Sequence, residues 1–234
     1  MFVGMNSFSL VKHPAEVLII GRPGSGKTTA MKYLTYIFTS LGIVDWVVVF
    51  TGTPSGWSCI PRDWIVSENY SEKLVEMMKW ASGPGKGKKG LLILDDITGV
   101  IKFQSKEWNE LVTKFRHLGE KKEDEDTGWS IFIGIHYANQ LSTTLKEAAT
   151  HAFLFRAESK SSIEALYNTF ASLGFESVRE WKEYVSENTD YQSKHFIICS
   201  KQQNSGMPMF QPAVVPFDDV RLKNFQLVDS SEVE

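Results

Sequence analysis

The sequence contains one stretch whose residue types and spacing can hold a triphosphate. It reads GRPGSGKT at residues 21–28 and fits the pattern G-x-x-x-x-G-K-[ST] in full. Glycines let consecutive backbone N–H groups turn toward phosphate oxygens, and a following helix N-terminus adds positive partial charge. We expect Lys27 to reach the β- and γ-phosphates and the Thr28 hydroxyl to ligate Mg²⁺. The residues predicted to contact ATP are Gly21, Arg22, Pro23, Gly24, Ser25, Gly26, Lys27, Thr28 and Thr29.

The surrounding sequence predicts the strand–loop–helix context that this motif needs. Ala15–Ile20 is an apolar run typical of a buried strand, and Thr28–Leu41 has apolar residues at helical spacing up to Gly42. A glycine-rich turn that merely caps a helix is the alternative, but it does not account for a Lys-Thr pair at this spacing. We therefore expect bound ATP with Mg²⁺ at this loop.

Two acidic residues follow another apolar run. The segment LLILDD at residues 91–96 has four aliphatic residues followed by Asp95 and Asp96, the Walker B pattern. A carboxylate at the C-terminal end of a strand lies at the sheet edge where α/β folds bind ligands. We expect Asp95 to hold Mg²⁺ through water and Asp96 to orient or deprotonate the attacking water. Two aspartates after a strand are also common in turns, but the phosphate loop upstream favours a catalytic role for them.

Two further polar positions are candidates for catalysis. Arg116 directly follows the predicted helix Lys106–Phe115, within the segment FRHLG, and it could face the γ-phosphate of a neighbouring subunit, as arginine fingers do. Arg and His before a glycine are also typical of a helix C-terminus, which the residue pattern alone favours. His136 ends the apolar strand Ser130–Ile135 and could donate or relay a hydrogen bond to the γ-phosphate. A histidine at a strand end is, however, often only solvated.

Apolar runs that alternate with helical patterns predict an α/β fold. Strands joined by crossover helices indicate a mainly parallel central sheet covered by helices on both faces. His195–Ser200 and Met209–Val215 predict a small C-terminal β-hairpin with Asn204–Pro208 as its turn. We therefore expect an ATPase core over 1–175 and an extension of helix, hairpin and tail over 176–234, packed on the core. The other expected strands are 44–50 and 152–155, the other expected helices are 71–81, 143–149 and 161–173, and the expected loops are 51–62, 83–90 and 120–126.

Composition excludes several other classes of protein. The 234 residues, 42% of them hydrophobic, can bury the core of one large α/β domain. Cys59 and Cys199 are too few for a disulfide framework and fit a reducing compartment. No apolar run has the length of a membrane span, and Met1–Leu10 lacks the pattern of a secretory signal, so we expect an intracellular protein. The net charge of −3 disfavours passive coating of DNA, although a motor with a few local contacts remains compatible with it.

The order of these motifs resembles a known family. Between about Ala15 and Tyr167 come the phosphate loop, an aromatic-rich loop, L-D-D-I, R-H-x-G and an apolar strand with a polar end. This order is similar to that of the poxvirus-type genome-packaging ATPases of the FtsK–HerA superfamily. Members of that family usually carry Gln at the strand end and then Pro and Arg, where this sequence has His136, Ser142 and Lys146.

The resemblance implies a P-loop NTPase fold of the additional-strand type, in which the strand ending at His136 lies between the two motif-bearing strands. It implies ATP hydrolysis coupled to translocation of double-stranded DNA by a homo-oligomeric ring, a hexamer or pentamer, that packages a viral genome. It also implies a capsid or portal-vertex protein as partner, and a location in the virion or host-cell interior, cytoplasm or nucleus. Catalysis would fall to Lys27, Asp96, His136 and Arg116, with Thr28 and Asp95 at the metal.

One loop is a candidate for gripping DNA. Gly83–Gly90 carries Lys86, Lys88 and Lys89 among four glycines, and basic loops can hold a DNA backbone without reading its sequence. A solvated linker between helix and strand is an equally good interpretation.

Two other functions stay open. A viral initiator-type replication helicase also uses an Asp-Asp pair, but it ends the sensor strand with Asn where this chain has His136. A non-motor NTP-binding protein, such as a nucleotide kinase, needs a lid with several arginines, and the segment after Phe155 offers few.

Overall fold

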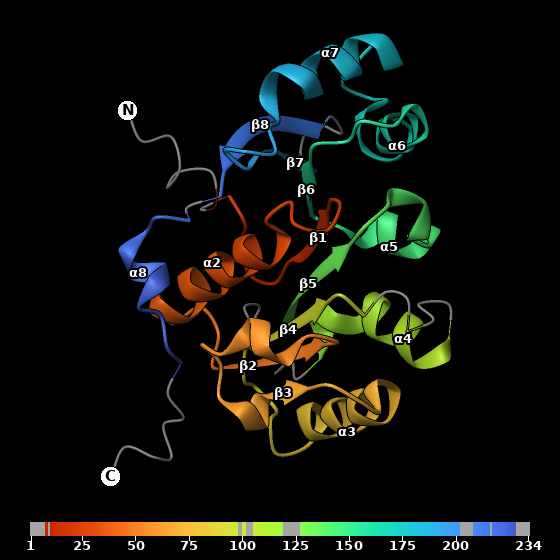
Figure 1. The fold of residues 1–234 in the computed structure, drawn as a ribbon. Helices are drawn as coiled ribbons and strands as arrows, with labels where there is room; N and C mark the ends of the chain where they lie inside the picture. The colour runs from red at the N-terminus through yellow and green to blue at the C-terminus, as the bar shows by residue number, and fades with distance from the viewer. Residues whose placement is uncertain are drawn as a thin grey trace.

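A single mixed sheet forms the centre of the molecule (Figure 1). The computed structural model describes residues 8, 10–97, 100–101, 105–118, 127–201, 208–215 and 217–227. In these residues eight strands pair in the order β3-β2-β4-β5-β1-β6-β7-β8, and those from β3 to β6 run parallel. The strands are β1 (Glu16–Ile20), β2 (Trp46–Thr51), β3 (Ile65–Val66), β4 (Gly90–Asp95), β5 (Trp129–Ile135), β6 (His151–Phe155), β7 (His195–Lys201) and β8 (Pro208–Val214).

Helices cover both faces of this sheet, as Figure 1 shows. On one face α2 (Lys27–Ser40) packs on the central strands, with α8 (Val220–Lys223) beside it. The opposite face carries the remaining helices. They are α3 (Tyr70–Ser82), α4 (Lys106–Lys114), α5 (Thr143–Ala148), α6 (Lys160–Leu166), continued by a π-helical turn Tyr167–Ala171, and α7 (Val178–Asn188).

The strands β1, β4 and β5 are buried along their whole length. Strands enclosed on both faces need apolar side chains on both sides, which explains why they read as continuous aliphatic runs and not as alternating patterns. The predicted α/β class, the mainly parallel sheet and the C-terminal hairpin are therefore confirmed. The expected strands and helices are present, with most boundaries within two residues of those predicted.

The C-terminal hairpin is an integral part of the sheet. Strand β7 pairs antiparallel with β6 from His151–Ser200 to Phe155–Phe196, and β8 pairs antiparallel with β7. Because β7 runs opposite to β1, it begins at the sheet edge where β1 ends, and β8 ends at that same edge. The hairpin therefore brings residues far along the chain next to the phosphate loop.

Some predicted and observed features differ in detail. The predicted loop over 51–62 contains two 3₁₀ turns, Pro54–Trp57 and Arg62–Trp64, which lead into β3. The sequence pattern missed β3 and α8, since two- and four-residue elements carry no periodicity. The predicted charged loop 120–126 and most of the predicted hairpin turn 204–208 lie outside the described residues. Among the helices that are described, none combines the length and the hydropathy that crossing a bilayer requires.

Candidate nucleotide site

The phosphate-loop motif joins the end of β1 to the start of α2, as its pattern predicts. Gly26, the residue before α2, has φ 106° and ψ 10°, a left-handed conformation that glycine adopts without the strain of a Cβ. Its carbonyl accepts the Ala30 N–H at 2.9 Å, which makes Gly26 the first carbonyl of the helix. On the β1 side the Gly21 N–H donates to the carbonyl of Ile135 at 3.1 Å, so the loop is fastened to β5.

Lys27 lies folded under its own loop. Its ammonium donates to the carbonyls of Gly21 at 2.6 Å and Arg22 at 3.1 Å, and the residue is almost fully buried. Burial lowers the pKa of Lys27, whereas the charges of Asp95 and Asp96 oppose that change. A cation held at this point would compensate the charge of a triphosphate bound by the loop.

Asp95 receives two hydrogen bonds on one oxygen. Thr28 Oγ1 and Trp57 Nε1 each donate to Oδ2 at 2.9 Å, and the residue is only 2% exposed. Burial raises the pKa of Asp95, while the hydrogen bonds from Trp57 and Thr28 and the charge of Lys27 lower it. The structure thus brings together the two predicted Mg²⁺ ligands, Thr28 and Asp95, and adds an indole N–H that the motifs did not reveal.

Asp96 and His136 meet above the strand ends. Asp96 turns away from β4 in a left-handed conformation with φ 58°, which Asp tolerates better than most residues. Its Oδ1 lies 3.0 Å from His136 Nε2, and His136 Nδ1 lies 3.3 Å from the ammonium of Lys27. The three side chains therefore form one hydrogen-bonded chain. Strand β5 lies between β4 and β1, which confirms the position that the resemblance implied for His136.

The chain of contacts assigns the histidine tautomer. An ammonium only donates, so His136 Nδ1 accepts from Lys27, and Nε2 then carries the proton that it donates to Asp96. A neutral imidazole in this tautomer offers one acceptor and one donor. A Gln side chain offers the same pair, which gives a physical reason why His can stand where the packaging ATPases that the sequence resembles usually have Gln.

A second group of residues contacts the phosphate loop from the C-terminal part of the chain. Lys194, just before β7, donates from Nζ to the carbonyl of Gly24 at 2.7 Å. The guanidinium of Arg22 stacks on the Tyr191 ring, 3.2 Å from its centroid. Sequence motifs gave no sign of these contacts. The only signal in the sequence was topological, because a predicted hairpin that joined the sheet beside β6 would begin and end at the phosphate-loop edge.

Arg116 lies far from the phosphate loop of the same chain. It sits in the 3₁₀ turn Phe115–His117, and its Nη2 is 3.5 Å from the carbonyl of Ala148, just before β6. The turn packs against Gly128, where a Cβ would overlap the Arg116 carbonyl oxygen, so the site requires glycine. Ala148 and Gly128 precede β6 and β5, so both lie at the edge of the sheet where the parallel strands begin. The structure therefore does not bring Arg116 together with the other predicted catalytic residues within one chain.

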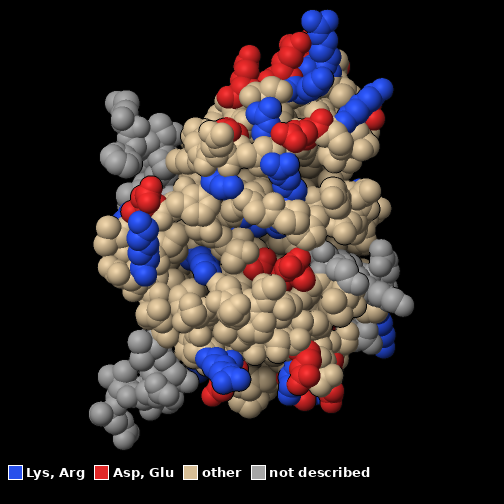
Figure 2. Space-filling model, viewed as in Figure 1, with Lys and Arg blue, Asp and Glu red and all other residues tan. Residues whose placement is uncertain are grey.

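The lysine-rich loop lies at this same strand-start edge. Gly90 begins β4, and its N–H donates to the carbonyl of Gly128 at 3.0 Å. Lys89 and Asp45 exchange backbone and side-chain hydrogen bonds, which fixes the end of the loop. On the face shown in Figure 2, basic and acidic side chains are scattered among uncharged residues, and no broad basic surface is present there.

No protein-family model matches this chain. Over 201 residues it is 23% identical to an uncharacterized protein, 075L, of Invertebrate iridescent virus 6, an alignment that covers 81% of this chain and 72% of the other. It is 24% identical over 170 residues to uncharacterized protein 015R of Frog virus 3, covering 68% of this chain and about half, 49%, of that relative.

The fold is that of a solved genome-packaging NTPase. The structure of B204 from Sulfolobus turreted icosahedral virus 2, in complex with ATP-γS, superimposes with a TM-score of 0.63. The match covers 86% of this chain and 99% of B204 at 15% sequence identity. At this identity the similarity shows the fold, and at that level it confirms the resemblance found in the sequence.

Proposed function

We propose that this chain is a ring-forming ATPase that uses ATP hydrolysis to move double-stranded DNA into a viral capsid. The observation that carries the proposal is the meeting of Lys27, the Thr28–Asp95 pair and the Asp96–His136 pair at one sheet edge. The shared fold with a genome-packaging NTPase and the similarity to two viral proteins support it.

The residues around Asp95 fit a magnesium ion. The hydroxyl of Thr28 and the carboxylate of Asp95 are hard oxygen donors, and a Cβ at Gly134 would lie 3.2 Å from Asp95 Oδ1, so the glycine leaves that oxygen unobstructed. Within the described residues no group of three or more His, Cys, Asp and Glu could form a metal cage. Mg²⁺ in nucleotide sites takes few protein ligands and retains water and phosphate oxygens. When bound, Mg²⁺ would neutralise charge on the phosphates.

Asp96 would act on the attacking water. Its side chain is half exposed, and its one described partner is His136, which leaves Oδ2 free to accept a proton from water. His136, held between Lys27 and Asp96, would couple the presence of the γ-phosphate beside Lys27 to the position of the Asp96 carboxylate. The role of His136 is therefore to position both charged groups through one acceptor and one donor.

The predicted ATP-binding residues and Arg116 lie at opposite edges of the sheet, and this arrangement favours a head-to-tail ring. The ATP residues lie where the parallel strands end, and Arg116 and the lysine-rich loop lie where they begin. A contact between unlike surfaces can repeat from subunit to subunit, and it gives a closed ring when the rotation between neighbours closes. Such a contact would bring Arg116 of one subunit to the ATP of the next, and it would give every subunit the same orientation of Lys86, Lys88 and Lys89.

The test measures ATP hydrolysis with and without double-stranded DNA, together with the native mass. We expect a ring and a rise in ATPase rate with DNA of any sequence, falling steeply with salt because each neutralised phosphate releases counterions. Serine in place of the three loop lysines should reduce the stimulation and leave basal hydrolysis intact. A control of equal charge change replaces three exposed lysines on other elements, Lys73, Lys160 and Lys182.

Each alternative function predicts a different result. Stimulation by single-stranded but not double-stranded DNA would favour the helicase. A monomer that hydrolyses or binds ATP without any response to DNA would favour a non-motor NTP-binding protein.

A further inference from the structure

The sheet order indicates on which side of β1 the nucleobase of a bound nucleotide would lie. The groups proposed to meet the γ-phosphate, Asp95, Asp96 and His136, follow β4 and β5, which lie on one side of β1. A nucleotide held by the phosphate loop with its γ-phosphate toward these groups must extend its base to the other side of β1. On that side lie β6, β7 and β8, and the chain leaving β8 ends at the phosphate-loop edge.

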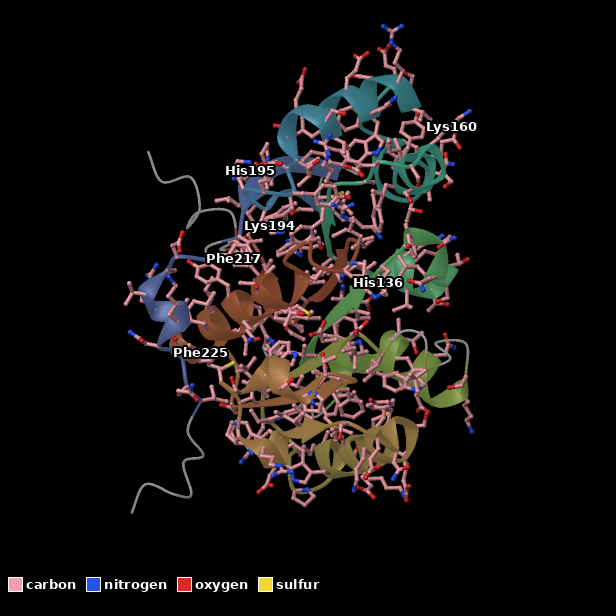
Figure 3. All side chains as sticks on the ribbon, in the orientation of Figure 1. His136, Lys160, Lys194, His195, Phe217 and Phe225 are labelled. Carbon is pink, nitrogen blue, oxygen red and sulfur yellow. The ribbon has the colours of Figure 1, made fainter. Side chains whose placement is uncertain are left out.

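The segment that leaves β8 carries an aromatic ring against the phosphate loop. A Cβ at Gly26 would lie 3.2 Å from Phe217 Cζ, 3.4 Å from Val215 Cγ2 and 3.5 Å from Phe155 Cε1. Gly26 immediately precedes Lys27 and begins α2, so the ring edge of Phe217 touches the loop at the point from which the helix starts. Figure 3 shows Phe217 and Lys194 close together beside α2, with His136 apart from both.

Phe217 is placed for contact with a ligand more than for core packing. It is 39% exposed, whereas Phe225 in the same segment is 8% exposed and packs edge-on against Tyr36 of α2. A large ring exposed to this extent adds little to the stability of the core, and an aromatic surface beside a nucleotide site can hold a base by stacking.

From this geometry we infer that Phe217 is the platform on which the nucleobase of the bound nucleotide stacks. The inference rests on the proposed function, since it assumes a nucleoside triphosphate in the loop. Stacking uses the π-face that every base has, so Phe217 by itself gives affinity without distinguishing adenine from other bases. The ring is a binding residue and takes no part in the transfer of the phosphoryl group.

The surroundings of Phe217 hold it at the loop. Its N–H donates to the carbonyl of Val215 at 2.9 Å, and the Val215 N–H donates to the carbonyl of Lys194 at 3.2 Å. Lys194 in turn contacts the Gly24 carbonyl through Nζ. Farther along, the Leu227 N–H donates to the carbonyl of Cys59 at 2.8 Å, so the segment crosses α2 and is attached at both ends. Because the backbone that carries Phe217 is already fixed beside the loop, stacking on a base would not require this segment to become ordered first.

The test compares a ligand that has a base with one that has none. Binding of ATP-γS and of inorganic triphosphate is measured by calorimetry on the full chain, with Phe217→Ala, Phe217→Leu and Phe217→Tyr as variants. We expect Phe217→Ala to weaken ATP-γS binding about 5- to 30-fold and to leave triphosphate binding unchanged. Phe217→Leu keeps an apolar contact with Gly26 but lacks the π-face, so it should behave like Phe217→Ala, whereas Phe217→Tyr should bind as the parent does.

A matched control is Val220→Ala, which removes an exposed apolar side chain three residues later and should change neither affinity. If Phe217→Ala weakens both ligands equally, the ring supports the loop by packing, and the stacking inference is overturned. Unchanged ATP-γS affinity in Phe217→Ala and Phe217→Leu overturns it as well. A parent protein that binds neither ligand overturns the proposed function itself, so the two failures are distinguishable.

Discussion

The buried carboxyl of Glu16 should make the stability of the protein depend on pH, and the size of this effect can be worked out. It is the first residue of β1, it is fully buried, and neither carboxylate oxygen has a hydrogen-bond partner among the described residues. Burial raises its pKa from 4.5 to about 8, against the opposing charges of Arg116 and Lys201. The folded protein therefore keeps this carboxyl neutral at pH values at which the unfolded chain has already lost the proton.

The sign of the effect on stability follows from proton binding. Between pH 4.5 and about 8 the folded state holds one more proton at Glu16 than the unfolded state does, so the free energy of unfolding falls as pH rises. The contribution is fully present below pH 4.5 and is lost as pH rises through about 8. At about 1.4 kcal/mol for each pH unit, the loss from pH 5 to pH 8 is about 4 kcal/mol.

The change Glu16→Gln keeps the shape and removes the titration. We compare the free energy of unfolding of Glu16→Gln with that of the parent. The value for the variant minus the value for the parent should increase by about 4 kcal/mol from pH 5 to pH 8. Urea unfolding at several pH values measures it, and Glu187→Gln, an exposed glutamate on α7, is the control. Parallel stability curves for parent and Glu16→Gln would refute the reasoning, because they would show that Glu16 is ionised throughout and paired with a buried cation.

Four further outcomes test the nucleotide site. Lys27→Ala should abolish ATP hydrolysis and weaken nucleotide binding, which a hydrolysis assay and calorimetry check; turnover near the parent rate would contradict the phosphate-loop assignment. Asp95→Ala should impair Mg²⁺-dependent binding, whereas Asp96→Asn should keep ATP bound and lose about 10²- to 10⁴-fold in turnover. Equal loss of binding in both would show that the two roles are wrongly divided. His136→Gln should retain much more turnover than His136→Ala in the same assay, since the amide offers the same acceptor and donor. Mixed rings of Lys27→Ala and Arg116→Ala subunits should recover activity that neither variant has alone, and an assembled but inactive mixture would favour the helix-end role of Arg116.

The sequence predicted the parts of the site that local patterns encode. The phosphate loop has a fixed spacing and Asp95 follows an unbroken aliphatic run, so the residue pattern alone places both at strand ends. The buried strands were predicted for the same reason, because enclosure on both faces leaves a continuous apolar signal. The proximity of His136 to Asp96 depended on strand order, which the family resemblance supplied and the residues alone did not.

Contacts between distant segments could not be predicted in this way. Trp57 lies 38 residues before Asp95, and its hydrogen bond depends on the path of an irregular loop after β2. Lys194 is 170 residues from Gly24, and only the antiparallel pairing of β7 with β6 brings them together. Phe217 does not belong to any sequence motif either. Its proximity to Gly26 follows from where β8 ends, a property of the folded sheet.

The surroundings of Arg116 bear on how it could serve another subunit of the proposed ring. The charge of Arg116 lowers the pKa of the Glu16 carboxyl, against the larger effect of burial, which raises it. The guanidinium of Arg116 contacts the Ala148 carbonyl at 3.5 Å and lies 5.3 Å from the centroid of the Phe115 ring. In a two-fold symmetric dimer like surfaces meet, and Arg116 would face its own copy. The proposed head-to-tail ring would instead place Arg116 at the strand-end edge of the neighbour, within reach of the next phosphate loop.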